Sequence, residues 1–287
     1  AFTATANPAT QRTLQSVLNL QTPTVVRLSP YRANLHLQVK TTWTPRGRQQ
    51  ALLQLIQRHR GKSGLVYLRT RRDSEALAQT LAEKGYATAA YHAGLPGERR
   101  RQIETQWLKG QLQFVVSTNA FGMGVNKSAV RWVAHLHAPA LLAEYIQEVG
   151  RAGRDGKPAE ALTLVSEPTG LLAPSDQQRL RFFQQQAEKQ QQRAMQLSHS
   201  IPKQGNITAI QREFRDGAIA LSYLHSQGRL QWTDPFHYQL VTPAPSGQKP
   251  SNSARSDRVM AQFLYGKGCR WQYLLGQCGF RGEAQRL

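Results

Sequence analysis

Two arginines set three residues apart give this sequence its clearest chemical signal. Arg151 and Arg154 lie in the run QEVGRAGRDG, which begins at Gln147 and ends with Asp155 and Gly156. We expect this run to be helical, because residues three apart then share one face. A guanidinium is planar and permanently charged, which suits phosphate oxygens. In phosphoryl transfer, an arginine from a neighbouring element stabilises charge on the γ-phosphate.

The alternative for a lone arginine pair is a basic helix end exposed to water. Here the pair is combined with a glutamine, two Gly-Arg steps and a terminal Asp-Gly within ten residues. Such a combination favours a phosphate-binding role over an accidental one.

A second glycine-containing run, STNAFGMGVNK, follows a predicted strand at 112–117. Its glycines are therefore expected in a loop at the carboxyl edge of a sheet, where ligands bind in parallel α/β folds. An ordinary tight turn is the alternative for Gly122 and Gly124. For His92, in the run YHAGL, the alternative is a histidine buried in the core.

These runs together resemble the conserved motifs of superfamily-two helicases, in the form found in RecQ proteins. The run at 147–156 resembles the sixth motif and the run at 117–127 the fifth. Residues 3–6 resemble the third motif, and residues 29–35 resemble the segment that joins the two motor domains. Residues 63–67 resemble the fourth motif, and residues 91–95 with Arg100 resemble the motif between the fourth and fifth.

The resemblance implies a role for each matching residue. Arg154 would be the main arginine finger and Arg151 its partner at the nucleotide. The other residues implied at the nucleotide or in its coupling to DNA are Gln147, Asn126, Gly124, Asp155, Thr3 and Thr5. Those implied in DNA binding are Ser117, Thr118, Lys127, His92 and Arg100.

The elements that must position these residues alternate between strand and helix. Short apolar runs indicate strands at 63–68, 86–91, 112–117, 130–136 and 161–165, and amphipathic stretches between them indicate helices. This order predicts an α/β fold with a parallel sheet covered by helices on both faces. By the resemblance it is a RecA-like sheet. Trp43, Trp107, Trp132, Phe182 and Phe183 are expected in the core.

The resemblance also gives expected domain boundaries. Residues 1–28 would end a first RecA-like domain and 29–168 would form the second. A mainly helical, incomplete zinc-binding subdomain would occupy 169–201 and 254–287, interrupted by a winged-helix-like insertion and linker at 202–253. Arg215, Arg229 and His237 of this insertion are expected near DNA phosphates. The alternative is an insertion with a structural or protein-contact role.

Cysteine usage limits metal binding and suggests the compartment. The chain has two cysteines, too few for a closed four-ligand zinc site. Cys269, in a helix that resembles the zinc subdomain, is therefore a zinc ligand only if an intact protein supplies the others. Sparse cysteine fits the reducing cytosol, with nucleoid association in a bacterium.

Charge points to a polyanionic partner. The chain has 37 Lys and Arg against 17 Asp and Glu, a net charge of +20, which usually indicates nucleic acid. No apolar stretch approaches the length of a membrane span. We expect the partner to be DNA at junctions of single strand and duplex; protein partners are not indicated.

The resulting prediction is part of an ATP-dependent, Mg²⁺-requiring DNA helicase that moves 3′ to 5′ and acts in repair and recombination. The alternatives are an RNA helicase and a non-catalytic nucleic-acid-binding module. The sequence contains no GxxxxGK[ST] phosphate loop and no acidic Mg²⁺ motif. We therefore expect a fragment cut at both ends that is inactive in isolation.

Overall fold

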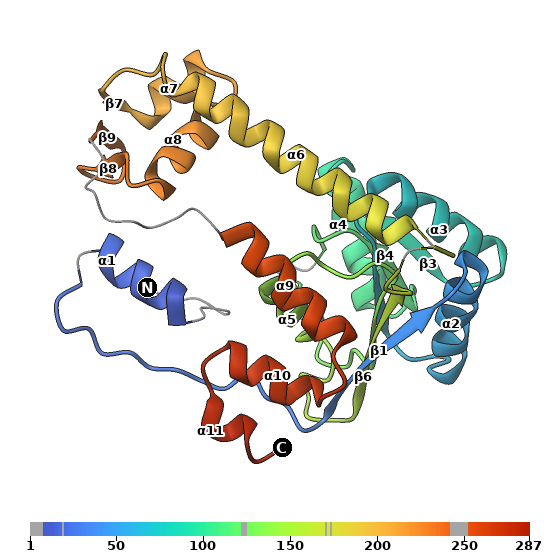
Figure 1. Cartoon of the computed structure of the whole chain (residues 1–287). Helices are drawn as coiled ribbons and strands as arrows, with labels where there is room; N and C mark the ends of the chain where they lie inside the picture. Colours follow the sequence, from blue (N-terminus) through green and yellow to red (C-terminus); the bar gives the residue numbers. More distant parts are fainter. Residues whose placement is uncertain (1–7, 19, 122–124, 170, 173, 242–251) are drawn as a thin grey trace. The chain divides into compact units, whose positions relative to one another are not determined.

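A computed structural model describes residues 8–18, 20–121, 125–169, 171–172, 174–241 and 252–287 (Figure 1). Contacts divide the chain into two units. The first comprises residues 1–176 and 256–287, and the second comprises residues 177–255. These limits differ from the expected ones, because the long helix after residue 176 belongs with the inserted module and the last helices belong with the sheet.

The first unit is built on a six-stranded sheet in the order β1-β6-β5-β2-β4-β3, with every pairing parallel. The expected parallel α/β sheet is therefore confirmed. Its strands are β1 (Leu35–Thr42), β2 (Gly64–Tyr67), β3 (Thr88–Tyr91), β4 (Phe114–Ser117), β5 (Trp132–His135) and β6 (Ala159–Ser166).

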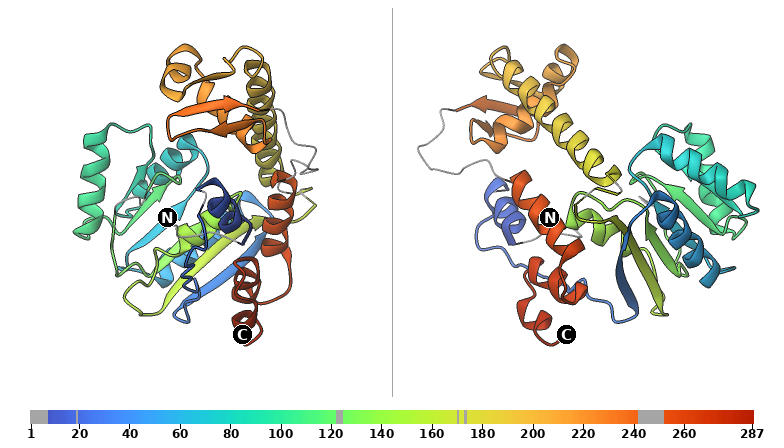
Figure 2. Two further views of the ribbon diagram at one scale, coloured as in Figure 1. Left: turned by 90° about the vertical axis from the view of Figure 1, so that its left-hand side faces the viewer. Right: turned by 45° about the vertical axis from the view of Figure 1, so that its right-hand side comes forward.

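Helices cover both faces of this sheet (Figures 1 and 2). Alternate residues of each strand enter two separate cores, as the twofold period of a strand requires. Leu65 and Tyr67 pack on one face, and Val66 and Leu68 on the other. The first face is covered by α4 (Gly97–Leu108), α5 (Leu142–Val149) and the C-terminal helices, and the second by α2 (Pro45–Arg58) and α3 (Arg71–Glu83).

Strand β1 and helix α2 were absent from the sequence prediction. The strand LHLQVKTT mixes polar residues with apolar ones and lies at an edge of the sheet. The helix has clear local signals, because the Thr44 hydroxyl accepts a hydrogen bond from the Gly47 amide at 3.0 Å and Pro45 occupies the first turn. A threonine cap and a proline could have located this helix.

The C-terminal helices α9 (Asn252–Tyr265), α10 (Arg270–Gln277) and α11 (Arg281–Ala284) follow a long excursion of the chain. From α9, Phe263 is fully buried and lies 4.6 Å from the ring of Tyr145 on α5. The side chain of Arg270 donates to the Phe263 carbonyl at 2.6 Å. These contacts make the last helices part of the first unit. Helix α1 (Pro8–Val17) precedes the sheet in sequence.

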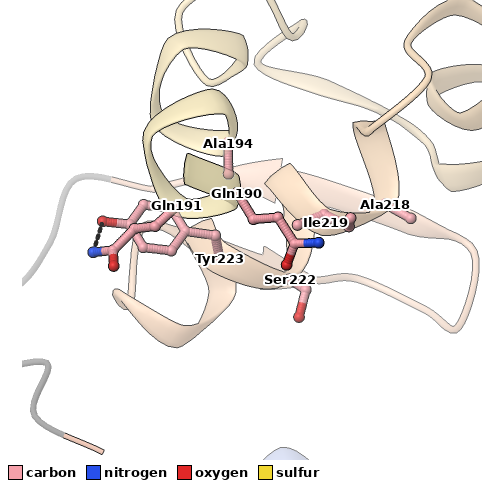
Figure 3. A pocket seen from close by; sticks show the side chains of 7 residues that line it. All are labelled: Gln190, Gln191, Ala194, Ala218, Ile219, Ser222 and Tyr223. Atoms are coloured by element: carbon pink, nitrogen blue, oxygen red, sulfur yellow. Dashed lines mark hydrogen bonds between the residues drawn. The ribbon is translucent and has the colours of Figure 1, made fainter. Parts of the chain in front are cut away.

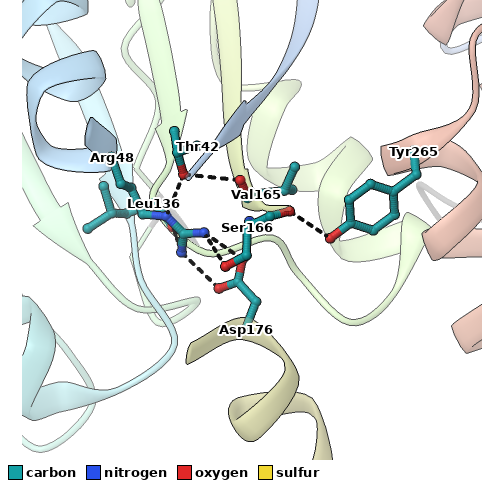
Figure 4. A network of polar contacts seen from close by, with 7 residues as sticks. All are labelled: Thr42, Arg48, Leu136, Val165, Ser166, Asp176 and Tyr265. Atoms are coloured by element: carbon teal, nitrogen blue, oxygen red, sulfur yellow. Dashed lines mark hydrogen bonds and ion pairs between the residues drawn. The ribbon is translucent and has the colours of Figure 1, made fainter. Parts of the chain in front are cut away.

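Arg48 on α2 joins the sheet to the first turn of α6 (Ser175–Leu197) (Figure 4). Its guanidinium forms a two-pronged ion pair with Asp176, at 2.8 and 2.6 Å. It also donates to the Leu136 carbonyl at 3.1 Å and the Ser166 hydroxyl at 3.0 Å. The Arg48 side chain is 7% exposed, so this is a largely buried ion pair with satisfied donors.

The second unit contains most of α6, β7 (Gln204–Asn206), α7 (Ile207–Glu213), α8 (Gly217–Ser226), β8 (Leu230–Trp232) and β9 (His237–Leu240). Its three strands form an antiparallel sheet in the order β7-β9-β8. A separate core includes Ile210, Leu221, Leu224 and Tyr238. Two helices followed by a hairpin match the winged-helix-like order expected from the sequence.

The expected aromatic core is correct only in part. Trp107 and Trp132 are buried. Trp43 is wrong, because it lies between β1 and the cap of α2 and is 60% exposed. Phe182 is also wrong, because its position on α6 leaves it 54% exposed. The side chain of Phe183 lies outside the described residues.

Candidate nucleotide and nucleic-acid site

Residues 150–156, which we call the arginine turn, follow the end of α5 at Val149. Gly153 and Gly156 have φ of 61° and 78°, a region that residues with a side chain rarely adopt. The expected helix through Arg151 and Arg154 is therefore wrong, because these glycines reverse the backbone instead of continuing it.

The backbone of the arginine turn lies against the amino ends of the strands. The Gly153 amide donates to the Val130 carbonyl at 2.8 Å, just before β5. Asp155 pairs with Arg131 and accepts from the Lys157 amide at 3.2 Å. The Asp155 carboxylate, implied at the nucleotide, is used to fix the turn.

Arg154 is exposed and contacts the neighbouring fifth motif. Its Nη1 donates to the Asn126 side-chain oxygen at 2.8 Å, and its Nε to the Gly150 carbonyl at 3.3 Å. Burial, followed by the charge of Arg151, lowers the pKa of Arg154. The structure therefore brings together three of the residues expected at the nucleotide, which are Arg154, Asn126 and Arg151. Gln147 is exposed on α5.

Glu148, inside the sixth-motif run, anchors a buried polar network that sequence reasoning missed. Its carboxylate accepts two hydrogen bonds from Arg69, at 3.1 and 2.8 Å, and lies 2.8 Å from Nε2 of His135. Nδ1 of His135 lies 3.1 Å from the Thr163 hydroxyl. A carboxylate on the apolar side of a short helix was the available signal, since a buried charge requires partners.

Charge pairing determines the ionisation of this network. Burial alone would raise the pKa of Glu148, but the hydrogen bond from His135 and the charge of Arg69 lower it to about 2. Burial lowers the pKa of His135 against the opposing effect of Glu148, and this favours the neutral imidazole, whose Nε2 faces the carboxylate. The network pairs the Glu148 carboxylate with the Arg69 guanidinium and His135, and it holds α5 directly before the arginine turn.

The fifth-motif residues differ in exposure. Ser117 is fully buried, and its hydroxyl lies 2.9 Å from the Tyr91 carbonyl, so its side chain has no access to DNA in this structure. Thr118 is 8% exposed. The Lys127 ammonium contacts the Trp107 carbonyl and lies 4.8 Å above its ring, and burial lowers the pKa of Lys127. Gly122 and Gly124 lie outside the described residues.

His92 is buried, with Nε2 2.7 Å from Glu75 on α3. This matches the alternative of a histidine buried in the core, although its Nδ1 is buried without a hydrogen-bond partner. Arg100 lies on α4 beside Tyr91, whose pKa is raised to about 12 by burial and by the hydrogen bond to Glu104. Thr3 and Thr5 lie outside the described residues.

In the second unit, all three expected DNA-binding residues are exposed: Arg215, Arg229 and His237. His237 on β9 lies 2.8 Å from the Asp234 carboxylate. An open pocket of about 440 Å³ lies between α6 and α8 (Figure 3). Its lining includes Gln191, whose amide donates to the Tyr223 hydroxyl at 3.2 Å, and the 41% exposed Ile219.

Cys269, the expected zinc ligand, is exposed at the start of α10, and Cys278 is half-buried. Within the described part of the chain, no three His, Cys, Asp or Glu side chains gather in a way that could hold a metal ion. None of the described helices has the length and apolar character needed to cross a membrane.

Comparison with known families matches residues 47–156 to the helicase conserved C-terminal domain. The ATP-dependent DNA helicase RecQ of Synechocystis sp. is 46% identical over all 287 residues, which cover 60% of that protein. The protein of the same name from Pasteurella multocida is 42% identical over 58% of this chain and 26% of its own length. The chain therefore spans less than two thirds of each of these relatives.

The fold is similar to that of Saccharomyces cerevisiae Dbp5 bound to RNA and ADP BeF3. The TM-score is 0.52 at 19% identity, over 62% of this chain and 47% of that one. This similarity shows the fold of the sheet region. The resemblance expected from the motifs is confirmed by the match along the whole chain: this protein belongs to the RecQ family of helicases and contains the helicase C-terminal domain.

Proposed function

We propose that this chain is part of an ATP-dependent DNA helicase and supplies the arginine side of its ATP site. Residues 29–168 would be the second motor domain and 1–28 the end of the first. The observation that favours this is the exposed guanidinium of Arg154 on a turn that also presents Arg151. Arg154 is exposed, whereas Arg151 is half-buried beside Tyr67, so Arg154 offers the more open guanidinium to a triphosphate.

The residues present fit the anionic part of ATP and not its metal. Arg154 and Arg151 would stabilise the charge that develops on the γ-phosphate. Asn126, by accepting from Arg154, would couple the nucleotide side to the loop at 117–127. Mg²⁺ and the phosphate-binding loop would have to be provided by residues other than these, because the 287-residue sequence contains no such loop motif.

For the nucleic-acid side, we propose DNA contacts by Lys127, Arg100 and the exposed residues of the second unit. The net charge of +20 supports a polyanionic partner. Movement from 3′ to 5′, a preference for junctions, a role in repair and recombination, and a place in the cytoplasm follow from family membership and are parts of the proposal. A zinc-binding role for Cys269 in a longer protein belongs to it as well.

Replacing Arg154 with alanine in the full-length protein tests the assignment. Removal of a charge that acts on the transition state should lower kcat for DNA-stimulated ATP hydrolysis by about a thousandfold, the scale of an arginine finger. Affinity for single-stranded DNA should stay within about twofold, because the phosphate contacts to DNA remain. Steady-state ATPase assays and fluorescence anisotropy measure the two quantities.

Arg46→Ala is a matched control, because Arg46 is an exposed arginine of the same domain, remote in sequence from the motifs. Normal ATP turnover with lost DNA affinity in Arg154→Ala would reverse the assignment. The RNA-helicase alternative predicts stronger stimulation by RNA than by DNA. The non-catalytic alternative predicts that the wild-type full-length protein does not hydrolyse ATP at all.

A further inference from the structure

The segment Tyr31–Asn34, directly before β1, contacts the arginine turn through two side chains. Arg32 donates to the Gly150 carbonyl at 3.2 Å and also contacts the Gly153 carbonyl. The amide of Asn34 donates to the carbonyls of Gly153 and Lys157, each at 2.8 Å. Two side chains of this segment, which we call the linker, therefore contact three carbonyl groups in and directly after the turn.

The turn is held by backbone hydrogen bonds from the amides of Gly150–Gly153 and Gly156, and the side chains of Arg32 and Asn34 add contacts to its carbonyl groups. Gly153, at φ 61°, sits so close to the linker that an added Cβ would lie 2.7 Å from the Asn34 amide nitrogen. Glycine is therefore needed here both for the backbone angle and for the close approach of Asn34. The two requirements together indicate that linker and turn are fitted to each other.

Arg32 and Arg154 meet on one acceptor. The Gly150 carbonyl receives both Nη1 of Arg32, at 3.2 Å, and Nε of Arg154, at 3.3 Å. Two guanidinium groups held this close repel each other, and burial together with the charge of Arg154 lowers the pKa of Arg32. Like charges kept together favour binding of an anion between them.

The linker is also held from its other side. The indole nitrogen of Trp271 on α10 donates to the Leu35 carbonyl at 2.9 Å, and its ring packs edge-on against Tyr31 at 5.3 Å. The segment is therefore fixed between the C-terminal helices and the arginine turn.

We propose that Arg32 and Asn34 are positioning residues that hold the arginine turn so that Arg154 meets the triphosphate in the productive geometry. This rests on the proposed function. Because these residues belong to the segment that resembles the joint between the two motor domains, a displacement of the joint acts directly on Arg154. The fork of Arg32 and the two donor hydrogens of Asn34 are the groups that transmit it.

Asn34→Asp in the full-length protein is the sharpest test, because the side chain keeps its shape but presents acceptors to two carbonyl oxygens. We expect kcat for DNA-stimulated ATP hydrolysis to fall about tenfold or more, since a small misplacement of a catalytic group has a large effect on rate. KM for ATP should stay within about threefold. Ala33→Asp, which places the same charge on the exposed neighbouring residue, should leave both unchanged.

A double variant separates positioning from general damage. If Asn34 acts through Arg154, then Arg154→Ala combined with Asn34→Asp should be no slower than Arg154→Ala alone. An equal further loss in the double variant, or unchanged kcat in Asn34→Asp, would overturn the proposal. Arg32→Lys keeps the charge but not the fork, and should recover only part of the rate lost in Arg32→Ala.

Hydrogen exchange tests the contacts of Arg32 and Asn34 with the arginine turn, which we call the clamp, without relying on activity. Amides of residues 150–157 should exchange faster in Asn34→Asp than in the wild type, and at the wild-type rate in Ala33→Asp. Unchanged exchange would contradict the clamp itself. Failure of Arg154→Ala to slow ATP hydrolysis, with altered exchange in Asn34→Asp, would instead contradict the proposed function and leave the clamp in place.

Discussion

At the scale of single residues, Glu148 determines how the arginine turn begins. Its side chain is 6% exposed and it pairs with Arg69, itself 11% exposed. Removing one partner of a buried ion pair leaves the other charge without compensation. The resulting loss of stability exceeds what the same change produces at the surface.

Glu148→Gln should therefore destabilise the chain by about 3 kcal/mol, measured by urea unfolding followed by circular dichroism. Glu144→Gln, a matched change on the same helix, should stay within about 0.5 kcal/mol. Equal effects of the two substitutions would show that the charge of Glu148 is unimportant.

The same carboxylate gives a pH dependence. Its pKa falls from 4.5 to about 2 on folding. The stabilisation is therefore complete above pH 4.5 and is lost as pH falls from 4.5 towards 2. Over this range the wild type should lose stability more steeply than Glu148→Gln, and parallel curves would contradict the assignment.

The sequence predicted the type of most residues at the site but not their geometry. The run at 147–156 indicated phosphate chemistry, since it combines glycine and arginine in one short segment. It did not indicate that the helix ends at Val149 and is followed by a turn with positive φ at Gly153, because the spacing of two arginines is compatible with either conformation. Glu148, Arg69 and His135 were missed because they meet only after folding.

At the scale of elements, two ion pairs on α2 show what burial changes. Arg48 pairs with Asp176, and the Arg48 side chain is 7% exposed. Arg58 pairs with Glu160, and the Arg58 side chain is 55% exposed. Both are arginines on one helix with a carboxylate partner at 2.6 to 2.7 Å. Their difference in burial makes them a matched pair.

Arg48→Ala should destabilise the chain by about 3 kcal/mol, because Asp176 and several acceptors lose their partner. Arg58→Ala should change stability by less than about 1 kcal/mol, as exposed pairs do. Thermal or urea unfolding of both variants measures this. A larger effect at Arg58 would show that the network in Figure 4 contributes little to the joint at α6.

The strands and helices with apolar runs could be predicted from the sequence, since burial on both faces leaves a near-continuous apolar signature. The edge strand β1 lacks such a continuous apolar run, but its sequence LHLQVK alternates apolar and polar residues, and this period of two could have located it. The limits of the inserted module differed from expectation because α6 reads as one polar helix, and a polar helix gives no indication of which unit it packs against.

At the scale of the whole molecule, the charge of +20 predicts salt-dependent DNA binding. Whether the second unit takes part can be measured from the slope of log affinity against log salt. Arg229→Ala should reduce that slope by about one if Arg229 contacts a phosphate. Fluorescence titrations at several salt concentrations give the slope.

Arg193→Ala provides the comparison, because Arg193 is an exposed arginine of the same unit that already faces Asp216 at 3.9 Å. The slope of log DNA affinity against log salt for Arg193→Ala should equal that of the wild type. An unchanged slope in Arg229→Ala would favour the alternative in which the inserted module serves as a protein-contact or structural element.

The bond from Trp271 to the Leu35 carbonyl joins residues 236 positions apart. During synthesis on the ribosome, the sheet strands emerge well before the indole that fixes the first of them. The nascent domain therefore lacks Phe263 and Trp271, which complete its packing, until the whole inserted module has been translated. Late completion of this kind makes the order of synthesis, and not only the final set of contacts, a determinant of how efficiently the chain reaches its native state.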